Sequence, residues 1–284
     1  MTGSIDYAGL FPPASLAMDD AVSEYERHRH APDHWALGRF VAPLSRWDEL
    51  SDAVRKLPDS GAAWPVSILA SPADVDRIRS IRAIGDEHLV VDAVESRAES
   101  VAEAGNAAGL VRLGIDVFVE VNVSADLDAI AAELSRIGAA AKLRTGGVVA
   151  TAFPESRHVL SFLRACQSAG IRFKATAGLH HAVRGEYRLT YEPVPPTGVM
   201  FGFLNVALAA ALLWFGRADD IVLAALEERS PASIELTDAG VSWRNERLTI
   251  AQLDEVRSEF FVGFGSCSFR EPMAEIGLEA LPRA

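Results

Sequence analysis

One local pattern recurs eight times in the sequence: a short apolar run, a polar turn, and a stretch with the 3.6-residue periodicity of an amphipathic helix. We expect the apolar runs to be strands at residues 5–11, 35–43, 64–71, 88–96, 115–124, 139–147, 171–179 and 199–208. Strict alternation of strands and helices favours parallel pairing through helical crossovers. The runs are almost continuously apolar, which is typical of a sheet covered on both faces.

Eight strand–helix units suit closure into a (β/α)8 TIM barrel. An open, doubly wound sheet is the structural alternative, but no G-x-G-x-x-G sequence follows the first expected strand. From about residue 218 the pattern changes to a hairpin-like segment, a helix opened by Thr249 and Gln252, and a Gly- and Ser-rich loop at 261–272. We therefore predict an α/β fold, with a TIM barrel at residues 1–217 and a C-terminal α+β extension at 218–284 that packs on it.

The formal net charge of −12 disfavours nucleic acid and anionic membranes as partners. Two cysteines, Cys166 and Cys267, do not form a disulfide framework, and the first residues do not resemble a signal peptide, so we expect a cytoplasmic protein. The apolar stretch 199–216 approaches the length of a membrane span, but Asn205 and its strand-like start favour a buried strand followed by a helix. The composition allows a homo-oligomer.

Lysine is rare in this chain, which contains three lysines and 24 arginines. Lys142 and Lys174 lie near the ends of two consecutive expected strands, and Lys56 is the third. Arginine stays protonated in proteins, whereas a lysine can lose its proton and act as a nucleophile. Because active sites of parallel barrels lie at the C-terminal ends of the strands, we expect Lys142 and Lys174 to belong to one site.

Further candidates are polar side chains within apolar runs, where an unpaired charge would be costly. They are Asp6 on the first expected strand, Arg39 on the second, Asp92 on the fourth, Glu120 on the fifth, Arg144 on the sixth, Thr176 on the seventh and Asn205 on the eighth. Desolvation and a second ammonium group both favour loss of a proton from a lysine, which can then attack a carbonyl carbon. We interpret Lys142 and Lys174 as a Schiff-base pair, with Glu120 and Asp92 as candidates for proton transfer.

The motifs K-L-R-T-G-G (142–147) and F-K-A-T-A-G-L-H (173–180) resemble those of class I deoxyribose-phosphate aldolase, which has K-x-x-T-G after strand six and K-x-x-G-G-[VI]-R after strand seven. V-V-D-A-V (90–94), V-F-V-E-V (117–121) and I-D-Y (5–7) are similar to its fourth, fifth and first strands. The resemblance covers about residues 5–215 and implies a cofactor-independent carbon–carbon lyase. It also implies that Lys142 forms the imine, that Lys174 lowers the pKa of this amine, and that Asp92 transfers protons.

The sequence departs from that family where phosphate would bind. Ala177 stands in place of the first glycine of the G-G pair, His180 replaces the arginine, and the serine pair of strand eight is absent. Arg144, beside Lys142, would suit a carboxylate. We therefore expect a small, carboxylated or unphosphorylated carbonyl substrate, bound by Arg144, Thr145, Gly146, Thr176, His180, Asn205, Arg39 and Asp6.

Other interpretations stay open. The lysines could be structural partners of Glu120 and Asp92, or the Gly-rich segments could bind phosphate in a phosphoribosyltransferase-like barrel. A third alternative is a non-catalytic barrel that binds a small anionic metabolite. His180 and His181 lack a metal-ligand spacing, so we expect no metal and no cofactor. Cys267 has no partner that the sequence identifies.

Overall fold

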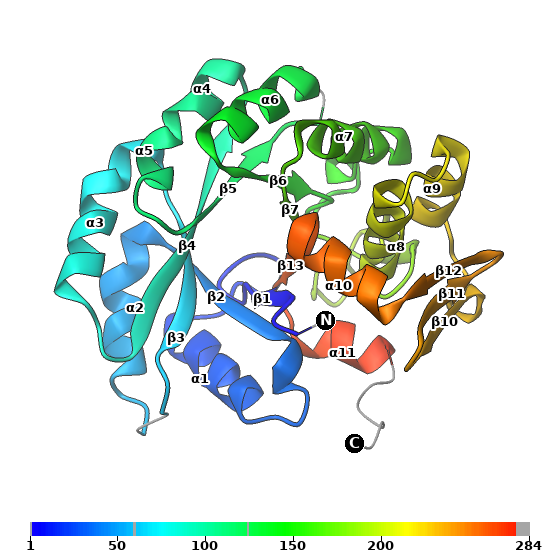
Figure 1. Cartoon of the computed structure of the whole chain (residues 1–284). Coiled ribbons are helices and arrows are strands. Elements are labelled where there is room, and N and C mark those ends of the chain that lie inside the picture. Colours follow the sequence, from blue (N-terminus) through cyan, green and yellow to red (C-terminus); the bar gives the residue numbers. More distant parts are fainter. Residues whose placement is uncertain (1, 59–60, 124, 277–284) are drawn as a thin grey trace.

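Eight parallel strands close into a barrel, as predicted for the fold class (Figure 1). The computed structural model describes residues 2–58, 61–123 and 125–276. Around the barrel the strand order is β1, β13, β7, β6, β5, β4, β3, β2. Their bounds are β1 (Ile5–Tyr7), β2 (Leu37–Pro43), β3 (Trp64–Leu69), β4 (Leu89–Ala98), β5 (Asp116–Val121), β6 (Ala140–Arg144), β7 (Phe173–Thr176) and β13 (Phe261–Ser266).

The helices form an outer layer around these strands (Figure 1). They are α1 (Met18–Arg29), α2 (Trp47–Val54), α3 (Val75–Ile84), α4 (Val101–Asn106), α5 (Ala108–Val111), α6 (Leu127–Ile137), α7 (Ser156–Ala169), α8 (Phe203–Trp214), α9 (Asp219–Leu226), α10 (Ile250–Glu259) and α11 (Arg270–Glu275). The main apolar core lies between this layer and the strands, and includes Trp64, Phe162 and Phe203. A TIM barrel is thus confirmed.

Local sequence signals set the ends of several helices. The side chain of Asp126 caps the start of α6, and Gly138 and Gly170 end α6 and α7 in the left-handed conformation that glycine adopts without strain. Thr249 and Gln252 form the expected capping box at the start of α10. These ends orient each helix so that the chain returns to the next strand.

The eighth barrel strand is not where the sequence placed it. Residues 203–214 form helix α8, and only residues 197–200 of the preceding segment are extended, as β9 (Thr197–Met200) in a hairpin with β8 (Gly185–Arg188). The strand that closes the barrel is β13, within the segment that we expected to be a Gly- and Ser-rich loop. The prediction of a strand at 199–208 is therefore wrong.

Composition explains both differences. Residues 203–214, FLNVALAAALLW, are rich in Ala and Leu, which favour helix over strand. In β13, Gly263 lies beside β1, where a Cβ atom would stand 2.4 Å from the carbonyl oxygen of Ser4. This glycine therefore allows two backbones to approach closely and does not mark a loop.

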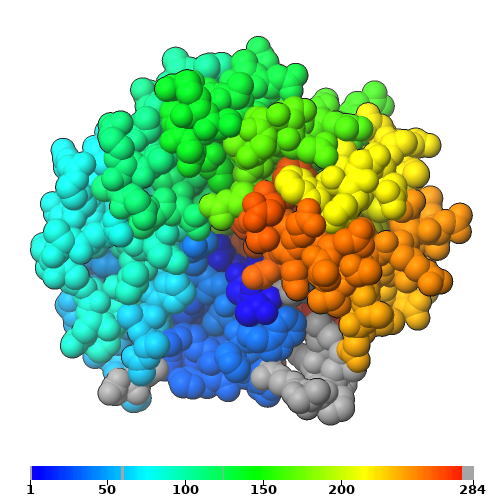
Figure 2. Space-filling model, in the orientation of Figure 1, coloured from blue at the N-terminus to red at the C-terminus, as the bar shows by residue number. Residues whose placement is uncertain are grey.

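The predicted boundary at residue 217 is also wrong, because β13 lies beyond it and pairs with both β1 and β7. A small antiparallel sheet of β10 (Ile234–Thr237), β11 (Gly240–Trp243) and β12 (Glu246–Thr249) lies outside the barrel beside α10 (Figure 1). Only this part of the expected extension is an appendage. The first barrel residues, in dark blue, lie next to the orange C-terminal part of the chain in the space-filling view (Figure 2).

Within the described residues, no helix combines the length and the apolar character needed to cross a membrane. Helix α8, at the centre of the most apolar stretch, has 12 residues, and nine of them are buried in the protein core.

Candidate functional site

A layer of polar side chains crosses the interior of the barrel. It contains Asp6 from β1, Ser67 from β3, Glu95 from β4, Glu120 from β5, Lys142 from β6 and Lys174 from β7, all of them buried. Glu120 lies opposite Lys142, and Lys142 lies opposite Lys174, in the register of three adjacent strands. Side chains of a strand alternate between its faces, so these paired positions turn to the same interior. Lys142 and Lys174 thus lie side by side on neighbouring strands and face the same interior.

Glu95 connects the two lysines. Its Oε2 lies 2.7 Å from Nζ of Lys142, and its Oε1 lies 2.7 Å from Nζ of Lys174. The hydroxyl of Ser67 donates a third hydrogen bond, of 2.8 Å, to Oε1. Burial by itself would raise the pKa of Glu95, but the two ammonium groups outweigh burial and hold this pKa well below its usual range. Glu95 is therefore a carboxylate shared by two cations.

Lys174 has a second carboxylate partner in Asp6, which also accepts a hydrogen bond of 2.7 Å from the backbone N–H of Arg39. Burial would lower the pKa of Lys174, but Asp6 and Glu95 outweigh it and raise this pKa above its ordinary value. The ring of Phe118 lies 5.3 Å from Nζ of Lys174. Lys174 is thus a fixed ammonium group.

Glu120 connects Lys142 with Arg144. Oε2 of Glu120 lies 3.0 Å from Nζ of Lys142, and Oε1 accepts a hydrogen bond of 2.7 Å from Nε of Arg144. Burial opposes ionisation of Glu120, but Lys142 and Arg144 outweigh it and lower its pKa. The guanidinium of Arg144 is half-exposed, at 51%, so it can contact a ligand while it holds Glu120.

A cavity of about 270 Å³ opens above this layer, at the C-terminal ends of the strands. It is lined by Ala8, Phe11, Pro12, Val41, Leu69, Glu95, Lys142, Arg144, Gly147, Val148, Lys174, Thr176, Ala177, His180, Gly265 and Cys267. The loops after β1, β6, β7 and β13 form its walls. This is the end at which barrel enzymes place their active sites. Of the expected site residues, the cavity contacts Lys142, Lys174, Arg144, Thr176 and His180 directly.

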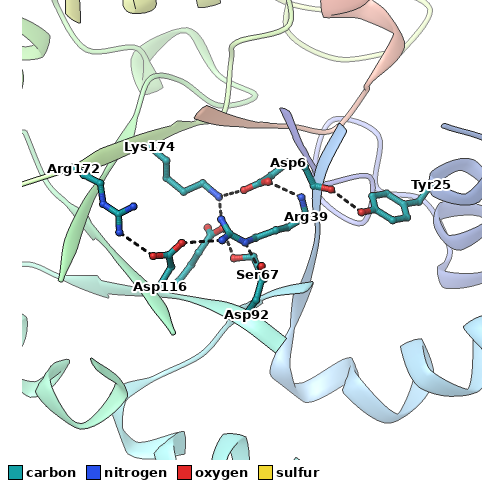
Figure 3. Close-up of polar contacts among 10 residues, drawn as sticks. Asp6, Tyr25, Arg39, Ser67, Asp92, Asp116, Arg172 and Lys174 are labelled. Atoms are coloured by element: carbon teal, nitrogen blue, oxygen red, sulfur yellow. Dashed lines mark hydrogen bonds and ion pairs between the residues drawn. The ribbon is translucent and has the colours of Figure 1, made fainter. Parts of the chain in front are cut away.

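Asp92 and Arg39 belong to a different cluster of charged side chains. This cluster lies toward the N-terminal ends of the strands, at the other end of the barrel. Arg39 binds Asp92 at 2.9 Å and Asp116 at 2.8 Å, and Asp116 also binds Arg172 at 2.9 Å (Figure 3). Burial raises the pKa of Asp92, although Arg39 opposes this shift. Glu95 lies within hydrogen-bonding reach of both lysines, whereas the ion pair of Asp92 is with Arg39.

A β-bulge in β4 explains why Glu95, and not Asp92, contacts the lysines. Val91 and Ala93 pair with consecutive residues of β3, so Asp92 is an extra residue in the strand. The extra residue reverses the alternation of side chains after it and turns Glu95 into the barrel. Simple alternation counted from Asp92 would point Glu95 outward, which is why sequence reasoning missed it.

Thr145 and Gly146 hold the cavity walls together. The hydroxyl of Thr145 donates to the carbonyl oxygens of Thr176 and Ala177, and so ties the loop after β6 to the loop after β7. A Cβ atom on Gly146 would lie 2.3 Å from the ring of Phe153. Both residues were expected to bind substrate, but the structure gives them contacts with the protein itself.

Asn205 lies in α8 and is fully buried. Its Oδ1 accepts hydrogen bonds from the backbone N–H groups of Arg184 and Gly202, and its Nδ2 donates to the carbonyl oxygens of Ala225 and Glu228. Gly202 precedes α8, Ala225 and Glu228 lie in and after α9, and Arg184 lies directly before β8. Asn205 therefore holds α8 to its neighbours, and it was placed in the site only because α8 was mistaken for a strand.

His180 and Cys267 meet in the cavity wall. Sγ of Cys267 lies 3.8 Å from Nδ1 of His180, and Oε2 of Glu271 lies 3.2 Å from the same nitrogen. The sequence singled out His180 and Cys267 separately, but the pair forms only because β13 is a barrel strand beside β7. In residues 2–58, 61–123 and 125–276, no group of His, Cys, Asp or Glu side chains is arranged to hold a metal ion.

Comparisons with known proteins give no family for this chain. No protein-family model matches it. No curated protein matches it either.

Proposed function

We propose that this protein is a Schiff-base enzyme, in which Lys142 forms an imine with a small, carboxylated carbonyl compound. The observation that carries the proposal is the sharing of Glu95 by Lys142 and Lys174 at the floor of one cavity. An imine needs a lysine that can lose its proton, a nearby group to receive that proton, and a pocket for the carbonyl compound. Lys142, the carboxylate of Glu95 and the cavity lie together at the C-terminal end of the barrel, which supports this assignment.

The two lysines differ in how firmly their charge is held. Lys174 contacts Asp6 and Glu95, and these carboxylates raise its pKa. Lys142 shares both of its carboxylates with other cations, because Glu95 also binds Lys174 and Glu120 also binds Arg144. We therefore assign Lys142, and not Lys174, as the nucleophile of the proposed reaction.

Glu95 is the proton carrier of the proposed reaction. Its carboxylate takes one proton from Nζ of Lys142, and the free amine adds to the carbonyl carbon to give a carbinolamine. Glu95 then returns the proton to the hydroxyl group, which leaves as water, and a protonated imine remains on Lys142. The electron pair of an adjacent carbon–carbon bond can flow into this imine, which is the chemistry of an aldolase-type lyase.

Charge within the cavity favours an anionic substrate. Among the described residues that line it, Lys142, Lys174, Arg144 and His180 can carry positive charge, while Glu95 is the one carboxylate. The pKa of His180 is raised to about 10: burial opposes its protonation, but Cys267 and Glu271 outweigh burial. The exposed part of the Arg144 side chain, beyond its contacts with Glu120, would suit a substrate carboxylate.

Borohydride trapping tests this proposal. The protein is incubated with pyruvate or glyoxylate and reduced, and peptide masses are compared with those of an unreduced sample. We expect one adduct on Lys142, because reduction converts the imine into a stable secondary amine. K142R should lose the adduct, and K56R, which changes the exposed third lysine, should keep it. If no small keto acid or aldehyde acid labels Lys142, the imine mechanism is wrong.

A non-catalytic site for a small anionic metabolite is the second candidate, because both lysines already bind carboxylates. It predicts that small carboxylates raise the melting temperature while borohydride gives no adduct. A phosphate site has less support, since the space beside Gly146 and Gly178 is filled by Phe153. A phosphate loop instead leaves its backbone N–H groups open to the ligand.

A further inference from the structure

A second reactive group lies in the cavity wall, on β13 and the loop after β7. Cys267 follows the last residue of β13, and both Cys267 and His180 line the same cavity as Lys142. Sγ of Cys267 is 3.8 Å from Nδ1 and 4.0 Å from Nε2 of His180. Neither residue takes part in the proton transfers proposed above, where His180 only adds positive charge to the cavity.

We propose that Cys267 is a second nucleophile of this cavity, with His180 as its base, and that it adds to the electrophilic carbon of a small carboxylated compound. A thiol becomes a nucleophile when an adjacent base removes its proton and a third group orients that base. Glu271 is the positioning residue, since its Oε2 lies 3.2 Å from Nδ1 of His180. Tyr191 in turn donates a hydrogen bond of 2.9 Å to Oε1 of Glu271.

The surroundings of the pair support this assignment. His180 is buried, and Cys267 and Glu271 raise its pKa to about 10 against the opposing effect of burial. The imidazole therefore holds a proton firmly once it has taken it from the thiol. Lys142, Lys174 and Arg144 add positive charge to the same cavity, with Glu95 as the opposing charge.

Cys166, the other cysteine, provides the contrast. It lies on α7 within the apolar core, where burial raises the pKa of its thiol to well above the ordinary value. A buried cysteine in apolar surroundings is unreactive. The two cysteines of the chain thus form a matched pair, one in the cavity and one in the core.

With a carbonyl compound the proposed step is balanced without a leaving group. The thiol proton moves to Nε2 of His180, 4.0 Å from Sγ, since Nδ1 faces Glu271, and Sγ forms a bond to the carbonyl carbon. The electron pair of the carbonyl double bond moves to its oxygen, which then receives the proton from His180. The product is a hemithioacetal or hemithioketal, and nothing is oxidised or reduced. A cavity with an amine on β6 and a thiol after β13 can hold two carbonyl groups at once.

Alkylation tests the inference without knowledge of the substrate. Iodoacetate and iodoacetamide carry the same reactive carbon, but only iodoacetate has a carboxylate. In either reaction Sγ bonds to that carbon, and iodide leaves with the electron pair. Rates are measured by peptide mass, with glutathione as the reference thiol for each reagent. We expect Cys267 to be labelled and Cys166 to stay unlabelled, which also reports that the protein is folded.

The variants separate the parts of the inference. H180Q should slow labelling of Cys267 at least about tenfold, because the thiol loses its base. The matched control H181Q changes a neighbouring histidine that binds Glu275, and it should leave the rate unchanged. E271Q should shift the pH dependence of labelling, which a purely structural contact would leave in place. Relative to glutathione, Cys267 should prefer iodoacetate, and R144Q should remove that preference.

The contradicting results are equally specific. If Cys267 reacts no faster than glutathione, or is labelled as fast in H180Q as in the unmodified protein, the assignment of Cys267 as a nucleophile with His180 as its base is wrong. If Cys267 reacts with iodoacetate no faster than with iodoacetamide, relative to glutathione, the proposal of a carboxylated ligand is wrong. The inference does not require the imine: K142R should keep the labelling of Cys267, whereas it should lose the borohydride adduct. Failure of one proposal is therefore distinguishable from failure of the other.

Discussion

At the scale of single residues, Glu95 holds the interior charges together. It is almost fully buried, and its two oxygens face two different ammonium groups. Charges in such surroundings stay ionised only while they are paired, because desolvation otherwise disfavours them strongly. The same carboxylate therefore stabilises the charged barrel interior and accepts the proton in the reaction that we propose for Lys142.

Replacing this carboxylate should be costly for stability. We expect Glu95→Gln to lower the free energy of unfolding by about 3–5 kcal/mol, because Lys142 and Lys174 lose a shared partner inside the barrel. Urea unfolding at neutral pH measures the loss. Glu49→Gln is the control, since Glu49 pairs with Arg46 at the surface and its loss should have little effect.

The pH dependence of this variant has a definite sign. The pKa values of Glu95 and Glu120 are lowered in the folded protein, so their contribution is present above the unfolded value of about 4.3 and is lost as the pH falls. Stability of the unmodified protein should decline in acid more steeply than that of Glu95→Gln. Parallel acid curves for the two proteins would mean that Glu95 carries no such charge.

The sequence predicts both lysines that bind Glu95, but neither Ser67 nor Glu95 itself. Asp6, Glu120, Lys142 and Lys174 stand out because each interrupts an apolar strand, and the structure brings all four into one layer. Glu95 is hidden by the bulge in β4, which depends on how this strand pairs with β3. The register between two strands depends on how they pair in the sheet, so it cannot be derived from the sequence of one strand alone.

At the scale of elements, the ends of β6 and β7 are joined into one wall of the cavity. Thr145 bonds to the turn after β7, and Phe153 packs on Gly146 and Gly178 from both loops. Ala177 has a φ of 63°, in the left-handed region that a non-glycine residue rarely adopts. The contacts of this turn with its surroundings stabilise that conformation. The two lysines keep their spacing because both strands end in this joined turn.

A methyl group at position 146 should open this wall. We expect Gly146→Ala to lower the free energy of unfolding by about 1–3 kcal/mol, because its Cβ would overlap the Phe153 ring. The double variant with Phe153→Leu should lose less than the sum of the two single changes. Gly109→Ala, in a helix with ordinary space around it, should be neutral or stabilising. Equal losses at positions 109 and 146 would contradict this packing.

The elements after residue 180 were harder to predict than those before it. The first seven strands follow from apolar runs separated by capped helices, and all seven were placed within a few residues. The eighth was missed because Gly263 and Gly265 read as a loop, whereas glycine is needed there against β1 and β7. Residues 203–208, the first half of α8, were predicted as strand because burial on all sides removes the periodicity that would show a helix.

At the scale of the whole molecule, the barrel is closed by segments from opposite parts of the chain. Ile5 of β1 lies opposite Phe264 of β13, and β13 also pairs with β7. The site inherits this arrangement, since Lys174 binds Asp6 and His180 contacts Cys267. Neither the residues before 217 nor those after it contain a complete barrel.

A fragment of residues 1–217 should therefore not fold by itself. Without β13, the edges of β1 and β7 are unpaired and the apolar faces that β13 covers are exposed to water. We expect the fragment to lack a cooperative thermal transition by circular dichroism. Co-expression with residues 218–284 should restore the transition if the two pieces associate. A fragment 1–217 that melts cooperatively at a temperature near that of the whole chain would contradict this.

Closure by β13 also has a consequence for synthesis. The ribosome synthesises β1 first. One of its two neighbouring strands, β13, can pair with it only after the residues around Phe264 have been synthesised. During that time the nascent sheet has two open edges, and the carboxylate of Asp6 is without the ammonium group made 168 residues later. Open strand edges are the sites at which unfinished chains associate with one another. The order of synthesis thus makes the incomplete barrel, and not the finished one, the form with open strand edges.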